Sequence, residues 1–229
     1  MSKRLAIFIF FFTASLAFSQ NAPLEKDSQM WNDVSVAVPL IKEKDKKGNE
    51  FNRLTFLVNG TLRIGRGISR PIDERFGFGF NYRVNRFVSL VPDYVYRFSQ
   101  PFPGRTNYEN RLRMAVILEK RWKKFSIANR NSFEYRFRHS QRDSSFYRNR
   151  LRFNYPVNKG GKLLFTPYVS NEPFYNFRQK AWTRNEVHTG ISRRINPNLT
   201  GDFYFLLLKD RSLPRTIIGF GLNLRFAVK

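Results

Sequence analysis

One pattern recurs along most of this chain. Apolar or aromatic residues alternate with polar, small or charged ones for about ten residues, a turn follows, and the alternation restarts. Residues 74–83 show it most clearly: the even positions from 76 to 82 are Phe, Phe, Phe and Tyr, and the odd positions are Arg, Gly, Gly, Asn and Arg. A period of two gives a strand with two unlike faces. The pattern therefore predicts an all-β chain.

The alternation predicts eleven strands, and no helical periodicity of useful length accompanies them outside the first twenty residues. The predicted strands are 31–40, 52–64, 74–83, 87–98, 108–119, 125–138, 147–155, 163–174, 183–193, 199–208 and 215–228. Short turns are expected near 84–86, 122–123, 158–161 and 196–198, and longer polar loops near 99–106, 139–145, 176–181 and 209–214. Alternating short and long connections are typical of an up-and-down meander whose two ends face different compartments.

The first nineteen residues have the organisation of a secretory signal peptide. Lys3 and Arg4 precede a short apolar stretch, and Ala17 and Ser19 stand three and one residues before the expected cleavage site. A single membrane anchor is the alternative, but the stretch is short for one. The expected division is a signal peptide at 1–19, a flexible segment at 20–30 and an outer-membrane barrel at 31–229.

Composition narrows the classes of function. There is no cysteine, which excludes a disulfide scaffold, a thiol nucleophile, an iron–sulfur cluster and a Cys-ligated zinc site. With 41 Lys and Arg against 17 Asp and Glu, the net charge of +24 on its own favours a nucleic-acid partner. Strict alternation, however, puts aromatics and arginines on opposite faces, whereas a stacking groove needs them on the same face. We therefore expect no nucleic-acid partner, and we expect no cofactor.

Three features favour a membrane barrel over a soluble β-sandwich or a lipocalin-like barrel. The segments have about the length of a tilted strand that crosses the hydrocarbon. Arginines stand mid-strand on the polar face, and on the lipid face each would cost about 2–4 kcal/mol. Aromatic residues gather near strand ends, where an interfacial girdle would lie. The predicted girdle is Trp31, Tyr82, Phe87, Trp122, Phe125, Tyr147, Tyr155 and Trp182.

We predict an antiparallel up-and-down transmembrane β-barrel of 10–12 strands in the bacterial outer membrane, present as a monomer. Bacterial single-chain barrels normally have an even number of strands, whereas the alternation gives eleven segments. Either 31–40 is not a barrel strand, which leaves ten, or one strand is missed, which makes twelve.

The polar faces of three consecutive segments carry eight arginines against three glutamates. We expect the lumen to be lined by Arg111, Arg113, Arg130, Arg136, Arg138, Arg148, Arg150, Arg152, Arg184, Glu109, Glu134, Glu172 and Glu186, with Asp202 among them. One interpretation is that Arg and Glu pair across strands and fill a narrow barrel, since the guanidinium fork binds carboxylates in bidentate fashion. The other is an electropositive pore, because rings of Arg or Lys make anion-selective channels.

Several short motifs occur in a characteristic order. They are Trp31 opening an alternating strand, the ENRLR run Glu109–Arg113, Arg130 followed by Glu134-Tyr135-Arg136, the RNRLR run Arg148–Arg152, Glu172 and Arg184. In these the chain resembles, from Trp31 to Lys229, a Gram-negative outer-membrane family catalogued as domain-of-unknown-function family 2490. The resemblance implies an outer-membrane barrel and brings no activity, because none is assigned to that family. The Arg-lined strands also resemble, more distantly, small porins that pass acidic oligosaccharides.

Two functional hypotheses follow from the lumen and the loops. The first is a narrow passive channel for small anionic solutes. The second is a closed structural barrel whose loops bind lipopolysaccharide phosphates through Arg105, Arg142, Lys180, Lys209 and Arg211. The partners expected for either are outer-membrane lipid, lipopolysaccharide and the barrel-assembly machinery.

A third hypothesis is an outer-membrane lipid hydrolase, which would need a serine and a histidine base. His139 lies beside Ser140, with Ser144 and Ser145 nearby, and His188 shares a face with Glu186 and Ser192. No nucleophile motif accompanies either histidine, so we expect no catalytic residues. The two histidines stand in different segments without a carboxylate cluster, so we expect no metal site.

Overall fold

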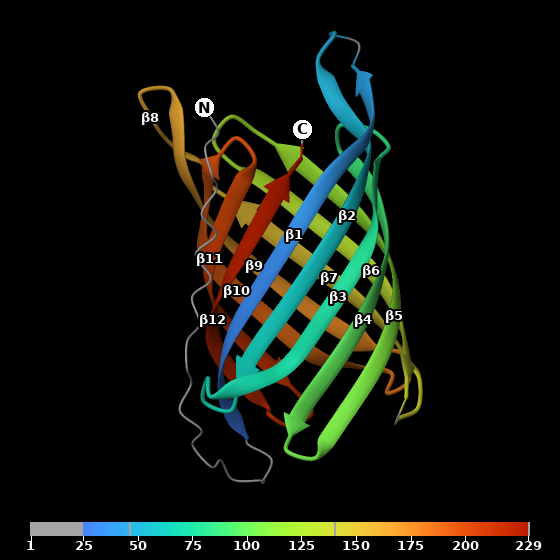
Figure 1. The fold of residues 1–229 in the computed structure, drawn as a ribbon. Coiled ribbons are helices and arrows are strands. Elements are labelled where there is room, and N and C mark those ends of the chain that lie inside the picture. The colour runs from blue at the N-terminus through green and yellow to red at the C-terminus, as the bar shows by residue number, and fades with distance from the viewer. Residues whose placement is uncertain (1–24, 46, 140, 229) are drawn as a thin grey trace, which may run out of the picture.

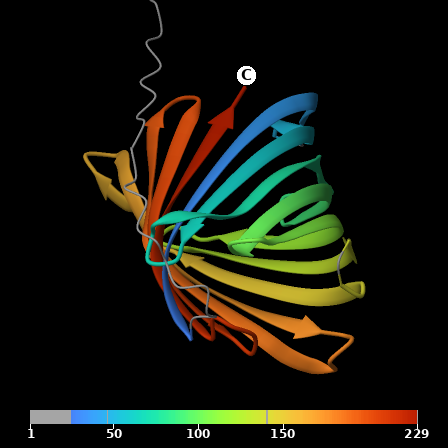
Figure 2. The same cartoon turned by 60° about the horizontal axis from the view of Figure 1, so that its bottom comes forward.

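The strands of this protein form one continuous sheet that closes on itself as a barrel (Figures 1 and 2). The computed structural model describes residues 25–228, apart from residues 46 and 140. The expected signal peptide at 1–19 lies outside the described residues. Within the described range, no helix is long and apolar enough to cross a membrane. The strands are β1 (Lys26–Lys44), β2 (Glu50–Gly65), β3 (Arg70–Arg83), β4 (Val88–Phe102), β5 (Arg105–Arg121), β6 (Ser126–Arg138), β7 (Ser144–Asn154), β8 (Val157–Lys159), β9 (Lys162–Asn176), β10 (Ala181–Asn196), β11 (Leu199–Asp210) and β12 (Thr216–Ala227).

Each strand except β8 pairs with its neighbour on both sides, and β1 pairs with β12 to close the ring. All ring pairings are antiparallel except this last one, which is parallel and places Lys26 beside Thr216 and Ala37 beside Ala227. β1 and β12 therefore begin at the same end of the barrel. We call the end where β12 finishes the C-terminal rim, at the top of Figure 1, and the other end the opposite rim.

The eleven predicted segments correspond to the eleven strands of the ring, so the fold class predicted from the alternation is confirmed. The twelfth strand, β8, has three residues at the position of the turn expected near 158–161, and it pairs with β9 outside the ring (Figure 2). Counting β8 makes twelve strands, but the ring itself is odd. The parallel pairing of β1 with β12 is what allows a ring of eleven, because alternating directions alone close only on an even number.

The strands are longer than predicted, and this corrects two expectations about the connections. Ring strands run for 11 to 19 residues, because backbone pairing continues past the last apolar side chain. The expected loop at 99–106 is a two-residue turn at 103–104 between β4 and β5, and the loops at the two rims do not differ in length as predicted. β1 also begins at Lys26, so part of the expected flexible segment 20–30 is strand.

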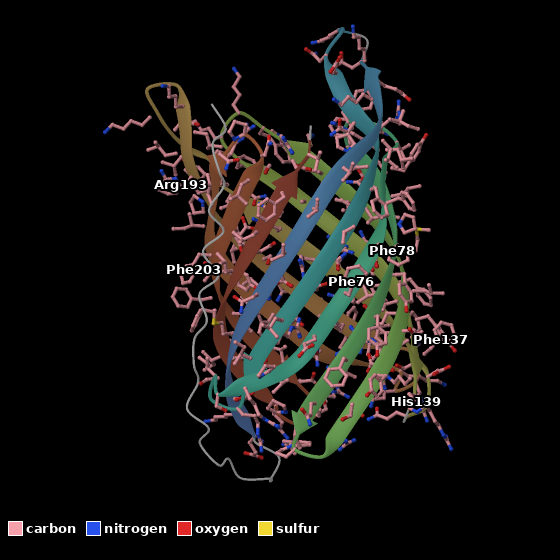
Figure 3. The ribbon with its side chains drawn as sticks, in the orientation of Figure 1. Phe76, Phe78, Phe137, His139, Arg193 and Phe203 are labelled. Carbon is pink, nitrogen blue, oxygen red and sulfur yellow. The ribbon has the colours of Figure 1, made fainter. Side chains whose placement is uncertain are left out.

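The two faces of the strands lie as the alternation predicts. Large apolar side chains on the outer face are exposed, and Figure 3 shows Phe137 and Phe203 pointing away from the barrel axis. The inner face carries nearly all of the buried polar and charged side chains, such as Glu109, Ser132 and Glu172. A sheet closed in this way has no unpaired edge, which is the condition for a sheet that lies in lipid.

One side of the interior is apolar. Buried side chains of β1, β9, β11 and β12 pack there into a cluster made of Trp31, Tyr168, Tyr204, Leu206, Leu208 and Ile217. Trp31 is 2% exposed and its Nε1 donates to Gln29 Oε1 over 2.8 Å. Its placement in an outer girdle is therefore wrong. Gln29, Trp31 and Asp33 occupy alternate positions on β1 and all face inward. The alternation along the strand therefore determines the orientation of Trp31, although it lies near a strand end.

The other large girdle residues are on the outside. Tyr82, Phe87, Trp122, Tyr155 and Trp182 are exposed, and Trp122 stacks on Phe125 with ring centroids 4.6 Å apart. Most of these lie at the C-terminal rim, whereas Trp182 and Tyr147 lie toward the opposite rim and contact one another edge to face.

Candidate functional site

The interior beside the apolar cluster is filled by ion pairs between arginines and carboxylates. Every one of the thirteen residues predicted to line the lumen takes part in at least one such pair: Arg111, Arg113, Arg130, Arg136, Arg138, Arg148, Arg150, Arg152, Arg184, Glu109, Glu134, Glu172 and Glu186. Cross-strand register explains the assembly, because Arg111 stands opposite Arg136, Arg113 opposite Glu134 and Arg130 opposite Arg150. Charged side chains two residues apart on a strand then project into the same space.

Glu134 is the centre of this network. Its side chain is 0% exposed and receives three guanidinium groups. Arg148 donates from Nη1 over 2.9 Å, Arg136 donates from Nε, and Arg111 Nη1 lies 3.6 Å away. A buried carboxylate is costly unless it is paired and hydrogen-bonded, and here both oxygens are paired.

Two further glutamates extend the network around the wall. Glu109 on β5 lies 2.6 Å from Arg111, 3.2 Å from Arg97 and 3.5 Å from Arg138. Glu172 on β9 joins two arginines of β7, Arg148 at 2.8 Å and Arg150 at 2.5 Å. These bridges connect β4, β5, β6, β7 and β9 through their side chains in addition to their backbone pairing.

Several members of the network are absent from the sequence prediction. Asp73 lies 2.7 Å from Arg75 and 2.6 Å from Arg97, and Asp93 pairs with Arg113 and lies 3.6 Å from Arg130. The parity of β3 and β4 would have found them, because Asp93 and Arg97 share the phase of the predicted Arg111 once the register is known.

The carboxylates lie behind the arginines. Twelve arginines share eight carboxylates in these ion pairs; the arginines are Arg75, Arg97, Arg111, Arg113, Arg130, Arg136, Arg138, Arg148, Arg150, Arg152, Arg184 and Arg225, and the carboxylates are Asp73, Asp93, Glu109, Glu134, Glu172, Glu186, Asp202 and Asp210. Glu172 and Asp202 are 5% and 2% exposed, whereas their partners Arg150 and Arg225 are 34% and 38% exposed. The charge that solvent reaches in this part of the interior is therefore positive.

These accessible arginines belong to one group, which we call the arginine quartet: Arg130, Arg150, Arg152 and Arg225. Arg130 and Arg150 are cross-strand partners on β6 and β7. Arg152 and Arg225 both approach Asp202, at 3.8 Å and 2.9 Å, although they come from β7 and β12. On their strands all four lie on the C-terminal-rim side of the fully buried Glu134 layer.

A hollow opens at the C-terminal rim. It has a volume of about 680 Å³ and is lined by the ends of β2, β3, β4 and β5 and the turn between β3 and β4. Its charged lining residues are Arg83, Arg86, Lys120, Arg121 and Glu119. Cations therefore outnumber carboxylates at this mouth.

The histidines considered for hydrolysis lie in different places. His188 is inside, where its Nε2 lies 3.7 Å from Glu186 Oε2 and its ring stacks on Tyr204 at 5.0 Å. Ser192 accepts a hydrogen bond from Arg225 over 3.2 Å. His139 is at the opposite rim (Figure 3), edge-on to Tyr108, and its neighbour Ser140 lies outside the described residues. Among the described residues, no group of three or more His, Cys, Asp or Glu side chains is placed to hold a metal ion.

The basic residues predicted to meet lipopolysaccharide share one rim. Arg105 begins β5, Arg142 and Lys180 lie in turns, and Lys209 and Arg211 flank the end of β11. All five are at the opposite rim, away from the C-terminus of β12.

The comparisons with known proteins concern family and architecture. The family described as "Protein of unknown function (DUF2490)" matches residues 28–211. No curated protein matches the chain. Among solved structures, a NanC porin is similar at a TM-score of 0.45 with 12% identity, over 76% of this chain and 82% of that one. LpxR from Salmonella typhimurium is similar at 0.43 with 6% identity, over 78% and 83%. An anion-selective porin from Comamonas acidovorans is similar at 0.37 with 12% identity, over 80% and 58%.

Proposed function

This chain belongs to the DUF2490 family, and from its interior we propose that it is an outer-membrane barrel of a Gram-negative bacterium that forms a narrow, anion-preferring passage. The observation that carries the proposal is the difference in exposure within the ion pairs. Carboxylates such as Glu172 and Asp202 are buried at the wall, while the guanidinium groups of Arg150 and Arg225 face the accessible space. A solute entering this space meets cations first, which favours anions.

The mouth at the C-terminal rim supports the same direction of selectivity. Its hollow carries four basic side chains and one acidic one, so an anion is already favoured before it reaches the arginine quartet. Between the quartet and the opposite rim the passage has to pass the layer around Glu134, where Arg111 and Glu134 are almost completely buried. We expect this layer to limit conductance and to restrict the passage to small solutes.

A closed structural barrel is the second candidate, and the burial of that layer is the observation that favours it. Ion pairs that fill the cross-section would stabilise the wall without leaving a path. In that case the basic residues of the opposite rim, Arg105, Arg142, Lys180, Lys209 and Arg211, would bind lipopolysaccharide phosphates as the main contact with the membrane. The lipid-hydrolase hypothesis gains no support from the arrangement of His139 and His188, which lie in different parts of the barrel.

Reversal potentials across a planar bilayer under a KCl gradient test the proposal. The wild type should conduct with a preference for chloride, and Arg150→Gln should reduce that preference because it removes an accessible guanidinium. Lys159→Gln is the control, since Lys159 is exposed on β8, which pairs outside the ring, where salt screens its charge. A barrel that inserts but gives no conductance would establish the closed alternative, and a preference for potassium would contradict the proposed selectivity.

A further inference from the structure

Asparagines form a polar area on the outer surface of the barrel, where the neighbouring strands are apolar. They lie on four adjacent strands, β6, β7, β9 and β10, and Asn131 is the direct cross-strand partner of Asn149. We call this area the asparagine patch: Asn129, Asn131, Asn149, Asn171 and Asn185.

The patch lies within the apolar band. On β7, Asn149 stands between Tyr147 and the exposed Leu151, and on β9 Asn171 follows the exposed Val169 two residues earlier. On β6 the residue after the patch on the same face is Phe133, which is 48% exposed. Large apolar side chains therefore flank the asparagines toward both rims, and in a membrane the patch would face hydrocarbon.

The side chains of the patch bond to one another. Asn149 donates from Nδ2 to Oδ1 of Asn131 over 2.8 Å, and Asn131 donates to Oδ1 of Asn129 over 2.5 Å. The hydroxyl of Tyr147 donates to Asn131 over 2.6 Å, and Asn171 donates to Asn185 over 2.9 Å. The amides thus form two bonded groups on adjacent strands, one of Asn129, Asn131 and Asn149 and one of Asn171 and Asn185, rather than scattered polar substitutions.

Some N–H donors of the asparagine side chains are not used within the patch. Each amide has two N–H donors, and within the described part of the chain Asn129 and Asn131 each use one, toward Asn149 and Asn129. In water the remaining N–H groups would be solvated. In hydrocarbon they have no partner, which is unfavourable, so the surface needs a polar neighbour at the same depth.

We propose that the asparagine patch is the contact between two copies of this chain in the membrane. Two copies inserted with the same orientation are related by a two-fold axis along the membrane normal, and this operation preserves depth. Each patch therefore meets an identical patch at its own level. Amides donate and accept, so the same surface satisfies both sides of an isologous contact. This proposal differs from the monomer predicted from the sequence, and it depends on the membrane placement proposed above.

Single-cysteine cross-linking tests the contact, because the chain contains no cysteine of its own. We would prepare Asn129→Cys, Asn149→Cys and Asn171→Cys in phosphatidylcholine vesicles and oxidise them with copper phenanthroline. Val34→Cys is the control, since Val34 is 43% exposed on the outer face of β1, on the far side of the ring. At least one patch variant should give a disulfide-linked dimer in most of the protein, while Val34→Cys should stay monomeric at the same lipid-to-protein ratio.

A second measurement removes the dependence on an introduced thiol. Photobleaching of singly labelled wild-type protein in vesicles should show two steps, and Asn131→Leu/Asn149→Leu should show one, because leucines match the lipid. Single-step bleaching of the wild type, or equal cross-linking of Val34→Cys and the patch variants, would overturn the dimer. Flotation with vesicles and heat-modifiable gel migration come first for every variant: if the wild type does not float, the membrane placement has failed, whereas floating monomers contradict only the dimer.

Discussion

Arg148 donates from Nη1 to Oε2 of Glu134 over 2.9 Å, although the two side chains start on different strands. The same guanidinium lies 2.8 Å from Glu172 on β9, so one arginine ties three strands together inside the barrel. Glu134 in turn holds Arg136 of its own strand and lies 3.6 Å from Arg111 on β5. The wall is thus held by backbone pairing and, independently, by shared charges within the interior.

Replacing Glu134 by glutamine should destabilise the barrel strongly. The change leaves three buried guanidinium groups without their common carboxylate, and removing one partner of a buried ion pair costs about 3–5 kcal/mol. Urea unfolding in detergent, followed by the loss of heat-modifiable migration, measures it. Glu119→Gln is the control, because its partner Arg121 is 79% exposed and such surface pairs contribute at most about 1 kcal/mol. Equal midpoints for the two variants would show that the interior is well solvated around Glu134.

The three tryptophans should differ in their contact with lipid. Trp122 and Trp182 are 42% and 51% exposed on the outer surface, whereas Trp31 is 2% exposed and lies under the guanidinium of Arg63, 3.4 Å from the ring centroid. Brominated lipid should therefore quench the fluorescence of Trp122 and Trp182 and leave that of Trp31 unchanged. Variants that keep one tryptophan each, with phenylalanine at the other two positions, separate the signals. Strong quenching of Trp31 would show that it lies in the outer girdle and not in the interior.

The two faces of the strands were predictable because the environment on each side differs sharply. A shift of the strand by one residue would turn Arg111 outward and Leu112 inward, so the alternation shows directly which residues face the interior. Position near a strand end does not determine which way a side chain faces. Trp31 lies near such an end, which favours a girdle, but it alternates in step with Asp33 and therefore lies inside. The asparagine patch was overlooked for the converse reason, since Asn131 and Asn149 interrupt the apolar face that the alternation otherwise defines.

The closure of the ring could not be predicted. The sequence of residues 26–37 does not indicate that they pair with 216–227 or that the pairing is parallel. The register between these distant strands depends on how all the strands of the barrel are arranged. The buried carboxylates Asp73 and Asp93 were missed for a related reason: their partners Arg97 and Arg130 lie on other strands, and only the assembled register brings them together.

Gly221 should be intolerant of even a small side chain. A Cβ there would overlap the ring of Tyr204 and approach Trp31 O at 2.7 Å, in the apolar cluster. Gly221→Ala should cost about 1–3 kcal/mol through overpacking, measured by urea unfolding. Gly60→Ala is the matched control on β2, since the nearest atom to its Cβ is Arg75 O at 4.0 Å, and it should leave stability unchanged or raise it slightly. A wild-type unfolding midpoint for Gly221→Ala as well would mean that the cluster rearranges to admit the methyl group.

Asp202→Asn should make the passage more selective for anions. The carboxylate is 2% exposed and accepts from Nη1 and Nη2 of Arg225, both at 2.9 Å, while Arg152 lies 3.8 Å away. Removing its charge leaves these two arginines of the quartet uncompensated on the accessible side. A unit charge about 8 Å from a solute in water changes its energy by ~0.5 kcal/mol, favourably for chloride and unfavourably for potassium, so the chloride-to-potassium permeability ratio should rise about fivefold.

Glu43→Gln is the control for that change. Glu43 pairs with Arg53 at 2.5 Å, but its side chain is 43% exposed near the end of β1, outside the interior ion pairs, where solvent and salt screen its charge. Its reversal potential should match that of the wild type. If Asp202→Asn lowers the ratio instead, the freed guanidinium groups have collapsed onto other carboxylates such as Glu172, and the quartet does not set the field that a passing anion meets.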